Sequence, residues 1–389
     1  MREELHIGHP IQNRNCHLSV LKEHPVKALP FTQHHGFRKA LTERVDAYIA
    51  ENKLPTRDVP AMYVKSAILV ACWLGIYLLI LLGGFPLWAN GLLCIAFAFS
   101  MVGIGMNIAH DANHGGYSNN PRLNRVMGLT MDSIGLSSFV WRSRHNVHHT
   151  YPNIGGLDED LENGGLIRLS PHEEWRPWFR LQMWYAPLLY AFVGFDFLGR
   201  DARVFFTGRT SQYHQYPKMK ASDRIIFVAG KLFFFGYILA LPMLVFPWWQ
   251  VLIAFISILF TLGLLMSAIT IPAHLVEAAD FPEPVGDPLH IENEWAIHQV
   301  QTAVNYAPDS RLVSFYVGGT NYQIEHHLFP HICHLQYPRL SPIVRKTCEE
   351  FGITYSVNPT MRGALLSHAR ALREFGRKPG STPARLSSG

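Results

Sequence analysis

Residues 64–109 read VKSAILVACWLGIYLLILLGGFPLWANGLLCIAFAFSMVGIGMNIA, and this stretch contains two long apolar runs with only Gly83-Gly84 between them. A transmembrane α-helix needs about 20 consecutive, mostly apolar residues. Residues 64–82 and 85–109 therefore each predict a membrane-spanning helix, and the short connection predicts that the two form a hairpin. Runs of this length with a charge-free turn favour membrane spans over core helices of a large soluble protein.

A second pair of apolar runs lies at 225–246 and 248–271, joined around Pro247. The sequence thus predicts an all-α integral membrane protein with four transmembrane helices in two hairpins. Lys231 fits this pattern poorly because a charged side chain inside a span is costly. We expect either that the third helix begins later than residue 225 or that the lysine extends to the membrane surface.

Charged residues lie on one side of the predicted hairpins. Neither connection contains Lys, Arg, Asp or Glu, so the N-terminus, the middle region and the C-terminus share the opposite side. The positive-inside rule makes that side cytoplasmic. The predicted parts are a cytoplasmic N-terminal arm (1–60), a membrane domain (61–375) with a cytoplasmic helical cap (110–224 and 272–375), and a flexible tail (376–389).

The composition argues against several other classes of protein. The net charge of +5 is mild, and no basic run interleaved with aromatics supports nucleic-acid binding. None of the five cysteines forms a C-x-x-C pair, so we expect a reducing compartment rather than a disulfide framework or a zinc ribbon. The first residues contain no apolar segment, so a cleaved secretory signal is not expected.

The cap contains two further apolar stretches, 126–141 and 184–198, which include Asp132 and Asp196. We expect them to be helices that lie on the cytoplasmic face of the membrane rather than cross it. Residues 153–180 are rich in Gly, Pro, Asp and Glu, which predicts a loop with short helices.

Three histidine clusters lie next to the predicted spans. They are His110-Asp-Ala-Asn-His114, His145-Asn-Val-His148-His149 and Gln323-Ile-Glu-His326-His327. Residues three or four apart share one face of a helix, so the imidazoles of a cluster can point at one metal ion. A single cluster can be incidental, and we expect His34-His35 of the arm to be solvated. Three clusters with ligand spacing on one side of the membrane predict a shared metal site.

The number of candidate ligands narrows the choice of metal. The clusters supply seven histidines, whereas a single zinc ion takes only three or four protein ligands. Two ions with three or four nitrogens each fit better. Imidazole ligation without thiolate is compatible with iron, copper, nickel or zinc. A site beside apolar spans suggests C–H chemistry on a lipid, which requires a redox metal and dioxygen, and iron is therefore preferred.

These patterns resemble the membrane fatty acid desaturases, which carry H-x(3,4)-H, H-x(2,3)-H-H and [HQ]-x-x-H-H boxes around two hydrophobic hairpins. The resemblance covers about residues 36–357 and extends through Asn146-Val-His-His-Thr-Tyr-Pro-Asn-Ile154 and Gly318-Gly-Thr-Asn-Tyr-Gln-Ile-Glu-His-His-Leu-Phe-Pro330. Gln323 followed by Glu325-His-His-Leu-Phe-Pro330 is similar to the front-end, linoleoyl-CoA-desaturase-like branch. The resemblance implies a fatty acyl desaturase with a di-iron centre.

The resemblance also implies an eighth histidine ligand just after the fourth span, where this chain has His274. His298 is a competing candidate, with a structural or surface role as the alternative. Gln323 replaces a histidine of other branches, and its amide oxygen could bind weakly or hold a metal-bound water. We expect His331 and His334, which follow the third box, to be structural or to support ligands.

Carboxylates within or near the boxes could accept the second N–H of ligating imidazoles and so fix their tautomer and orientation. The candidates are Asp111, Asp158, Asp160 and Glu325, with an ordinary surface role as the alternative for each.

The resemblance implies that dioxygen and two external electrons convert one methylene pair into a double bond, while the protein positions the chain. The substrate would be an acyl-CoA, an acyl carrier protein thioester or a lipid-linked acyl chain. The chain has no G-x-G-x-x-G motif and no His-Pro-Gly-Gly haem motif, and about 60 residues before the first span are too few for a cytochrome b5 domain. A separate ferredoxin or cytochrome b5 with its reductase is therefore expected, in a bacterial inner membrane.

Three alternatives remain open at this point. A hydroxylase, epoxidase or acetylenase would share the same boxes, because product choice depends on fine placement of the chain. A multi-pass haem or metal transporter would place histidines within spans on both sides of the membrane. A non-catalytic membrane scaffold would leave the histidines without a role.

Overall fold

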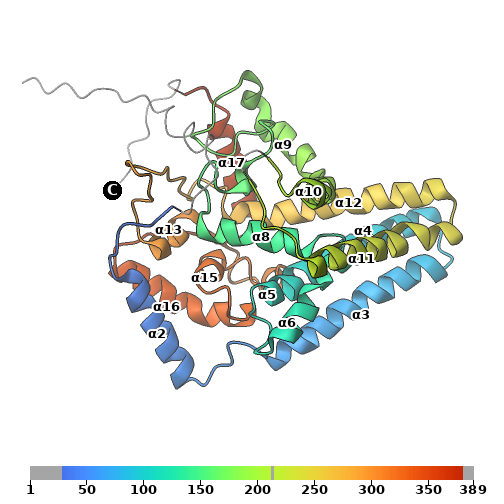
Figure 1. Ribbon diagram of the computed structural model, residues 1–389, viewed down its shortest axis with the longest axis horizontal. Coiled ribbons are helices and arrows are strands. Elements are labelled where there is room, and N and C mark those ends of the chain that lie inside the picture. Colours follow the sequence, from blue (N-terminus) through green and yellow to red (C-terminus); the bar gives the residue numbers. More distant parts are fainter. Residues whose placement is uncertain (1–28, 212–213, 380–389) are drawn as a thin grey trace, which may run out of the picture.

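The structure is a computed structural model that describes residues 29–211 and 214–379. Four long helices dominate it: α3 (Pro60–Leu82), α4 (Leu87–Ile104), α11 (Ala221–Phe235) and α12 (Trp248–Thr270). With their short continuations they form four apolar helical stretches, each long enough to cross a bilayer, and this confirms the four predicted candidate spans. Figure 1 shows the four helices running together to one end of the molecule, while the shorter helices gather at the other.

α4 is the central helix of this layer. It packs against both α3 and α12, and 72% of an apolar 18-residue window in the continuous stretch Leu87–Asn113 is buried. Phe97 and Met101 of α4 are among its fully buried side chains. The outer helices bear large exposed apolar side chains instead, such as Leu82, which is 77% exposed, and Leu232, which is 70% exposed. A soluble monomer rarely exposes so much contiguous apolar surface.

Lys231 corrects both expectations about the third helix. α11 begins at Ala221, earlier than residue 225 rather than later, and Lys231 does not extend outward. Its Nζ donates to Asp201 Oδ2 and to the Gly135 carbonyl oxygen, each at 2.6 Å. A charge inside an apolar layer is tolerated when it is paired in this way.

The stretch 126–141 is not one helix. It comprises the end of α6 (Pro121–Gly128), α7 (Thr130–Ser133) and the start of α8 (Ser138–Thr150). Gly135 breaks the stretch with φ of 97°, and a Cβ there would lie 2.7 Å from the Phe234 ring. Only glycine suits both the backbone conformation and the close packing.

The stretch 184–198 also divides into two helices, α9 (Gln182–Tyr190) and α10 (Val193–Thr207). α10 packs across α12. The approach is so close that a Cβ at Gly194 would overlap the backbone of Leu259. The predicted loop at 153–180 is confirmed, with only the short helices η2 (Glu159–Leu161) and η3 (Pro177–Leu181).

The remaining helices enclose the end of the layer where the histidine clusters lie. They are α2 (Phe37–Glu51), α13 (Trp295–Thr302), α14 (Arg311–Tyr316), α15 (Gln323–Leu328), α16 (Tyr337–Glu350) and α17 (Met361–Phe375). Part of the predicted N-terminal arm is α2, which packs on α13 and α16. Residues 1–28 of the arm and 380–389 of the predicted tail lie outside the described residues.

One small feature was not predicted. Strands β1 (Asn305–Tyr306) and β2 (Val357–Asn358) form a two-stranded parallel sheet. β1 is also close to α15. Asn305 Oδ1 accepts a hydrogen bond from the Ile324 backbone N–H, so the strand supports the start of the helix that carries the third histidine cluster.

Candidate metal centre

The first histidine cluster follows a single π-helical turn. η1 (Gly105–Ala109) continues α4 and leads directly into α5 (His110–Asn113), with His114 as the residue that ends α5. A π turn changes the face on which later side chains lie and is common at functional sites. The turn is packed tightly from outside, because a Cβ at Gly318 would overlap the Met106 carbonyl.

The other two clusters lie on short helices that cross the same region. The second is in the last two turns of α8, whose N-terminus is capped by Ser137 Oγ accepting from the Val140 N–H. The third is on α15, where His326 is 1% exposed and His327 is fully buried. His274 follows the 3-10 helix η6 (Ile271–Ala273) at the end of α12.

The three clusters and His274 converge into two groups. Each group brings ring nitrogens within 4.8 Å of one another. The first group is His110, His114, His145 and His326; the second is His148, His274 and His327. The seven residues come from four separate segments of the chain, as a shared site requires.

His149 lies between the two groups. Its ring centroid is 4.6 Å from that of His326 in the first group and 4.2 Å from that of His327 in the second. Its Nε2 is 3.0 Å from Nε2 of His145. Eight imidazoles therefore occupy one continuous volume.

In the second histidine group, neighbouring acceptors hydrogen-bond to the Nδ1 atoms of His148 and His274. Nδ1 of His148 is 3.0 Å from Asp158 Oδ2, and Nδ1 of His274 is 2.8 Å from the Thr302 carbonyl oxygen. Both partners are acceptors, so each Nδ1 carries the proton and each Nε2 presents a lone pair to the interior. This arrangement is typical of metal-ligating histidines.

Several inward nitrogens have no partner of their own. Nε2 of His114, His326 and His327 are buried and make no hydrogen bond. An unpaired buried polar atom is destabilising and is rare in proteins. A metal ion in each group removes that penalty, because His114 and His326 belong to the first group and His327 to the second, so the residues present fit a metal centre.

Burial also favours the neutral, metal-binding form of most of these imidazoles, whereas at His148 burial is outweighed by the carboxylates of Asp158 and Asp160, which raise its pKa. Burial, together with the other imidazoles nearby, holds the pKa of His145, His326 and His327 well below the usual value of 6.5. The pKa of His274 is lowered to about 3, mainly by burial and then by His148. Neutral imidazole is the ligating species.

The structure separates the two candidates for the eighth position. His274 lies with His148 and His327, with its ring centroid 4.6 Å from that of His148. His298 is buried elsewhere, with its ring 5.5 Å from that of Phe31, and it belongs to neither group of the described residues.

The predicted carboxylates take different partners. Asp158 accepts from His148 as expected, and Asp160 Oδ2 lies 3.6 Å from the same Nδ1 while Asp160 also pairs with Arg144. Asp111 instead accepts from Nδ1 and the backbone N–H of His334. Glu325 accepts from Asn305 Nδ2 and the Tyr355 hydroxyl, and burial raises its pKa to about 7.

Gln323 and His334, which we expected to support the metal ligands, lie at different distances from the two histidine groups. Gln323 lies against the second group, with Nε2 2.9 Å from His274 Nε2 and with its buried Oε1 unpartnered. His334 is buried and bonds Asp111 and Lys65 Nζ, the latter at 2.9 Å. His35 of the arm donates its backbone N–H to Glu294, and its exposed ring bonds only its neighbour Gln33, which fits the expected solvated pair.

Sequence patterns did not reveal Gln299 and Thr302 of α13. Gln299 Oε1 is 2.8 Å from Nδ1 of His327, and Gln299 is fully buried. The only available signal was a glutamine and a threonine on the buried face of a short helix, next to His298.

The family assignment follows from comparison with known proteins. Residues 86–359 match the family model described as fatty acid desaturase. The chain belongs to the fatty acid desaturase family. The matched range includes all three histidine clusters and His274.

Named relatives support the same conclusion. The desaturase is 40% identical to the sn-1 linoleoyl-lipid 6-desaturase of Arthrospira platensis over 88% of this chain and 94% of the relative. It is 38% identical to the sn-1 linoleoyl-lipid 6-desaturase of Synechocystis over 90% of this chain and 98% of the relative. An acyl-lipid (8-3)-desaturase of Physcomitrium patens is 31% identical over 88% of this chain. The protein is a fatty acyl desaturase, and these relatives are consistent with the front-end branch.

Proposed function

We propose that this desaturase introduces a double bond at the 6-position of an acyl chain esterified in a membrane lipid. The observation that carries the proposal is the extended similarity to two sn-1 linoleoyl-lipid 6-desaturases, which spans nearly the whole of each relative.

We assign two iron ions to the histidine groups. The first group is His110, His114, His145 and His326, the second is His148, His274 and His327, and His149 lies between them. Bound iron supplies the redox chemistry that couples dioxygen to removal of two hydrogens from neighbouring carbons. In balance, one CH2–CH2 unit, one O2, two electrons and two protons give one CH=CH unit and two waters.

The chain's own residues orient the ligands. Asp158 and the Thr302 carbonyl oxygen hold the Nδ1 protons of His148 and His274, so both Nε2 atoms face the site. Gln323 places an amide, rather than a ninth imidazole, beside His274. We propose that its oxygen holds water or binds weakly, which leaves the second group with an incomplete imidazole set.

The electrons come from a separate ferredoxin or cytochrome b5 and its reductase in this proposal. Its support is that the sequence contains neither a dinucleotide-binding G-x-G-x-x-G motif nor a His-Pro-Gly-Gly haem motif. The chain therefore contains no motif that binds a nicotinamide dinucleotide. Electrons from such a cofactor must reach the metal site through a separate carrier protein.

We further propose two transmembrane hairpins, α3 with α4 and α11 with α12, that position the metal site on the cytoplasmic side of a bacterial inner membrane. Residues 83–86 and 245–247 connect the helices at one end and contain no charge. The histidine groups and most Lys and Arg residues lie at the other end, which the positive-inside rule makes cytoplasmic. Residues 61–375 then form one membrane domain with a cap at 110–224 and 272–375.

Lipid analysis tests the function. Cells that express the protein with a ferredoxin and its reductase should accumulate acyl chains lighter by two hydrogens, with the new double bond at the 6-position. Cells with the His326→Ala variant should lack the product. A bond at another position would refute the regiochemistry, and a product that has gained one oxygen would identify a hydroxylase or epoxidase. Purified protein supplied with acyl-CoA or with phospholipid would identify the acyl carrier.

A further inference from the structure

The two histidine groups differ in how their rings are held. In the second group, Nδ1 of every imidazole lies within hydrogen-bond distance of an acceptor. The acceptors are Asp158 Oδ2 for His148 at 3.0 Å, the Thr302 carbonyl oxygen for His274 at 2.8 Å and Gln299 Oε1 for His327 at 2.8 Å. All three contacts join protein atoms, so they orient the rings independently of a bound ion.

Among the described residues, the first group has fewer such contacts. Nδ1 of His110 is buried and makes no hydrogen bond to them, and Asp111 Oδ1 lies 4.0 Å away, beyond hydrogen-bond distance. Nδ1 of His326 is 3.3 Å from Tyr337 OH, longer than the usual distance of about 2.9 Å. Two further members of this group are partly exposed, whereas all three members of the second group are buried.

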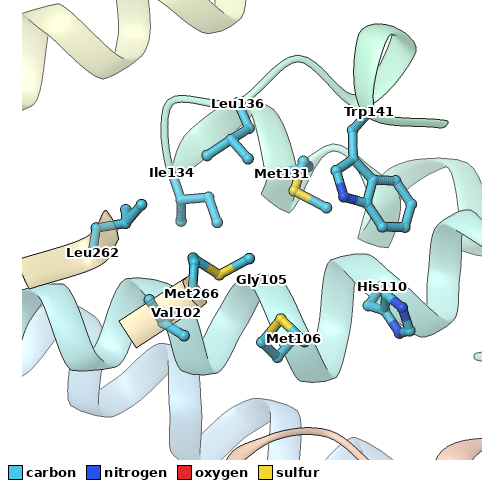
Figure 2. A pocket seen from close by; sticks show the side chains of 10 residues that line it. All are labelled: Val102, Gly105, Met106, His110, Met131, Ile134, Leu136, Trp141, Leu262 and Met266. Atoms are coloured by element: carbon cyan, nitrogen blue, oxygen red, sulfur yellow. The ribbon is translucent and has the colours of Figure 1, made fainter. Parts of the chain in front are cut away.

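The surroundings of His110 explain the difference. His110 borders an apolar cavity, with Trp141 and Met106 also in its lining (Figure 2). Apart from the rings of His110 and Trp141, the lining consists of aliphatic and thioether side chains and one glycine, none of which is a strong hydrogen-bond acceptor. The Trp141 ring also stacks on His145, with centroids 4.2 Å apart. Packing restrains the plane of a ring, but only a hydrogen bond selects which nitrogen carries the proton.

One buried asparagine links the supports of the second group. Asn153 follows α8 and is 1% exposed. Its backbone N–H donates at 2.9 Å to Asp158 Oδ2, the same oxygen that accepts from His148. Its side-chain Nδ2 faces three carbonyl oxygens, those of His274, Asp280 and Thr302, at 3.0, 3.0 and 3.3 Å. Asn153 therefore contacts the acceptors of both His148 and His274, and the backbone of His274 itself.

The amide of Asn153 joins parts of the chain that are distant in sequence. It connects the end of α8 with the residue after η6 and with the last residue of α13. The φ of Asn153 is 60°, in the left-handed region that glycine adopts freely and asparagine tolerates. Glycine would therefore suit the backbone at this position, but it would lose the amide that holds the three parts together.

We propose that the two metal positions are not equivalent: the second group is a preorganised site that takes up its ion first and holds it more tightly, and Asn153 is the positioning residue that preorganises it. The inference rests on the iron assignment in the proposed function. Ligand number alone favours the first group, which offers four imidazoles against three. Loss of one outer hydrogen-bond partner typically lowers metal affinity about 10- to 100-fold, so three such partners outweigh one additional imidazole.

Competition with a chelator tests the order of binding. The iron-loaded, full-length protein in detergent is equilibrated with rising concentrations of a chelator, and the iron retained per protein is measured. The wild type should release its two ions at chelator concentrations that differ at least about tenfold. His110→Ala removes a ligand of the first group and should keep the tightly held ion, whereas His274→Ala should lose it. Mössbauer spectra of the iron retained by His110→Ala should show a single type of site.

Asn153→Gly tests the positioning residue. Glycine keeps the left-handed backbone and removes the side-chain amide. The tightly held ion should then be released at a chelator concentration about 10- to 100-fold lower, while release of the weaker ion is unchanged. Loss of overall stability would instead weaken both ions. Asn163→Gly is the matched control and should behave like the wild type, because among the described residues the Asn163 amide bonds only Leu161 and Ile167 of the same loop.

The outcomes separate this inference from the proposed function. A wild type that binds no iron would refute the iron assignment and the inference with it. Two ions released together, or a tight ion kept by His274→Ala and lost by His110→Ala, would overturn the inference alone. Wild-type release of both ions from Asn153→Gly would show that Asn153 does not position the site. If Asn153→Gly does not fold, as judged by thermal unfolding, Asp158→Asn decides: it keeps the size of the side chain, removes the charge beside His148, and should weaken only the tight ion.

Discussion

Gln299 Oε1 lies 2.8 Å from Nδ1 of His327, and this contact ties the third histidine cluster to α13, a helix that carries no cluster. The amide can also take the opposite orientation, in which its nitrogen faces His327 Nδ1 and His149 O while its oxygen accepts from Trp295 Nε1. Metal on His327 Nε2 requires a proton on Nδ1 and hence the oxygen-facing orientation. Metal binding and the orientation of Gln299 are therefore coupled.

Replacing Gln299 should weaken metal binding without removing a ligand. Gln299→Leu deletes the acceptor for His327 Nδ1–H, and changes of this type typically lower metal affinity about 10- to 100-fold. Gln299→Glu retains an acceptor oxygen and should bind metal better than Gln299→Leu. Competition with a chelator, read as iron retained per protein, measures the effect. Equal retention in the wild type and Gln299→Leu would show that this contact does not support the site.

The eighth position can be tested against its competitor. His274→Ala should lower bound iron and abolish activity, because His274 lies within the second group. His298→Ala should retain iron, since its ring packs against Phe31 outside both groups. Iron content of the purified variants, determined beside His149→Ala as a positive control and His34→Ala as a neutral one, gives the answer. Iron loss in His298→Ala with retention in His274→Ala would reverse the assignment.

The sequence predicts most of what depends on short-range periodicity. Twenty-residue apolar runs predicted the four long helices, and the four-residue spacing correctly predicted that His110 and His114 lie together. The second and third clusters do not each point at one site as the spacing predicted, because His145 and His326 lie in the first group whereas His148 and His327 lie in the second. The sequence could not predict the π turn at 105–109, because no residue pattern distinguishes a π turn from the α-helix around it. Gln299 was missed because its role arises only when α13 packs against α15.

Lys231 is a second residue whose role could not be predicted, because its partner is distant in the sequence. Read alone, a lysine within an apolar run has no partner, so the sequence favours a shorter helix or a side chain that reaches the surface. Its partner Asp201 lies thirty residues earlier in the chain, on α10. Gly135 was read as part of a helix for a related reason, since only the Phe234 ring and the φ of 97° reveal the break.

Removing only one member of the ion pair between Lys231 and Asp201 should destabilise the protein. Lys231→Met leaves the Asp201 carboxylate buried without its cation, and such a change typically costs about 3–5 kcal/mol. The double variant Lys231→Met with Asp201→Asn removes both charges and should recover much of that loss. Thermal unfolding in detergent micelles measures the difference.

A surface pair supplies the control for this comparison. Lys39 and Glu43 lie 4.0 Å apart and are both exposed, so Lys39→Met should change stability by less than about 1 kcal/mol. If Lys231→Met were as stable as Lys39→Met, the buried pair would not hold α10 and α11 together. If the double variant were less stable than Lys231→Met, the loss would come from packing rather than from an unpaired charge.

His368 should make the attachment of α17 sensitive to acid. Its Nδ1 is 2.6 Å from the Leu275 carbonyl oxygen and its Nε2 is 2.8 Å from Tyr190 OH, so the neutral ring donates at one nitrogen and accepts at the other. Burial lowers its pKa from 6.5 to about 4. A group with a lowered histidine pKa stabilises the fold fully above the unfolded value of 6.5, and that stability is lost as pH falls from 6.5 toward 4. Each pKa unit corresponds to about 1.4 kcal/mol, so the effect is at most a few kcal/mol.

His368→Leu should be less stable than the wild type at neutral pH, and the difference between their melting temperatures should shrink as pH falls through this window. A difference that stays constant between pH 7 and pH 4 would show that the proton on His368 does not control the contact.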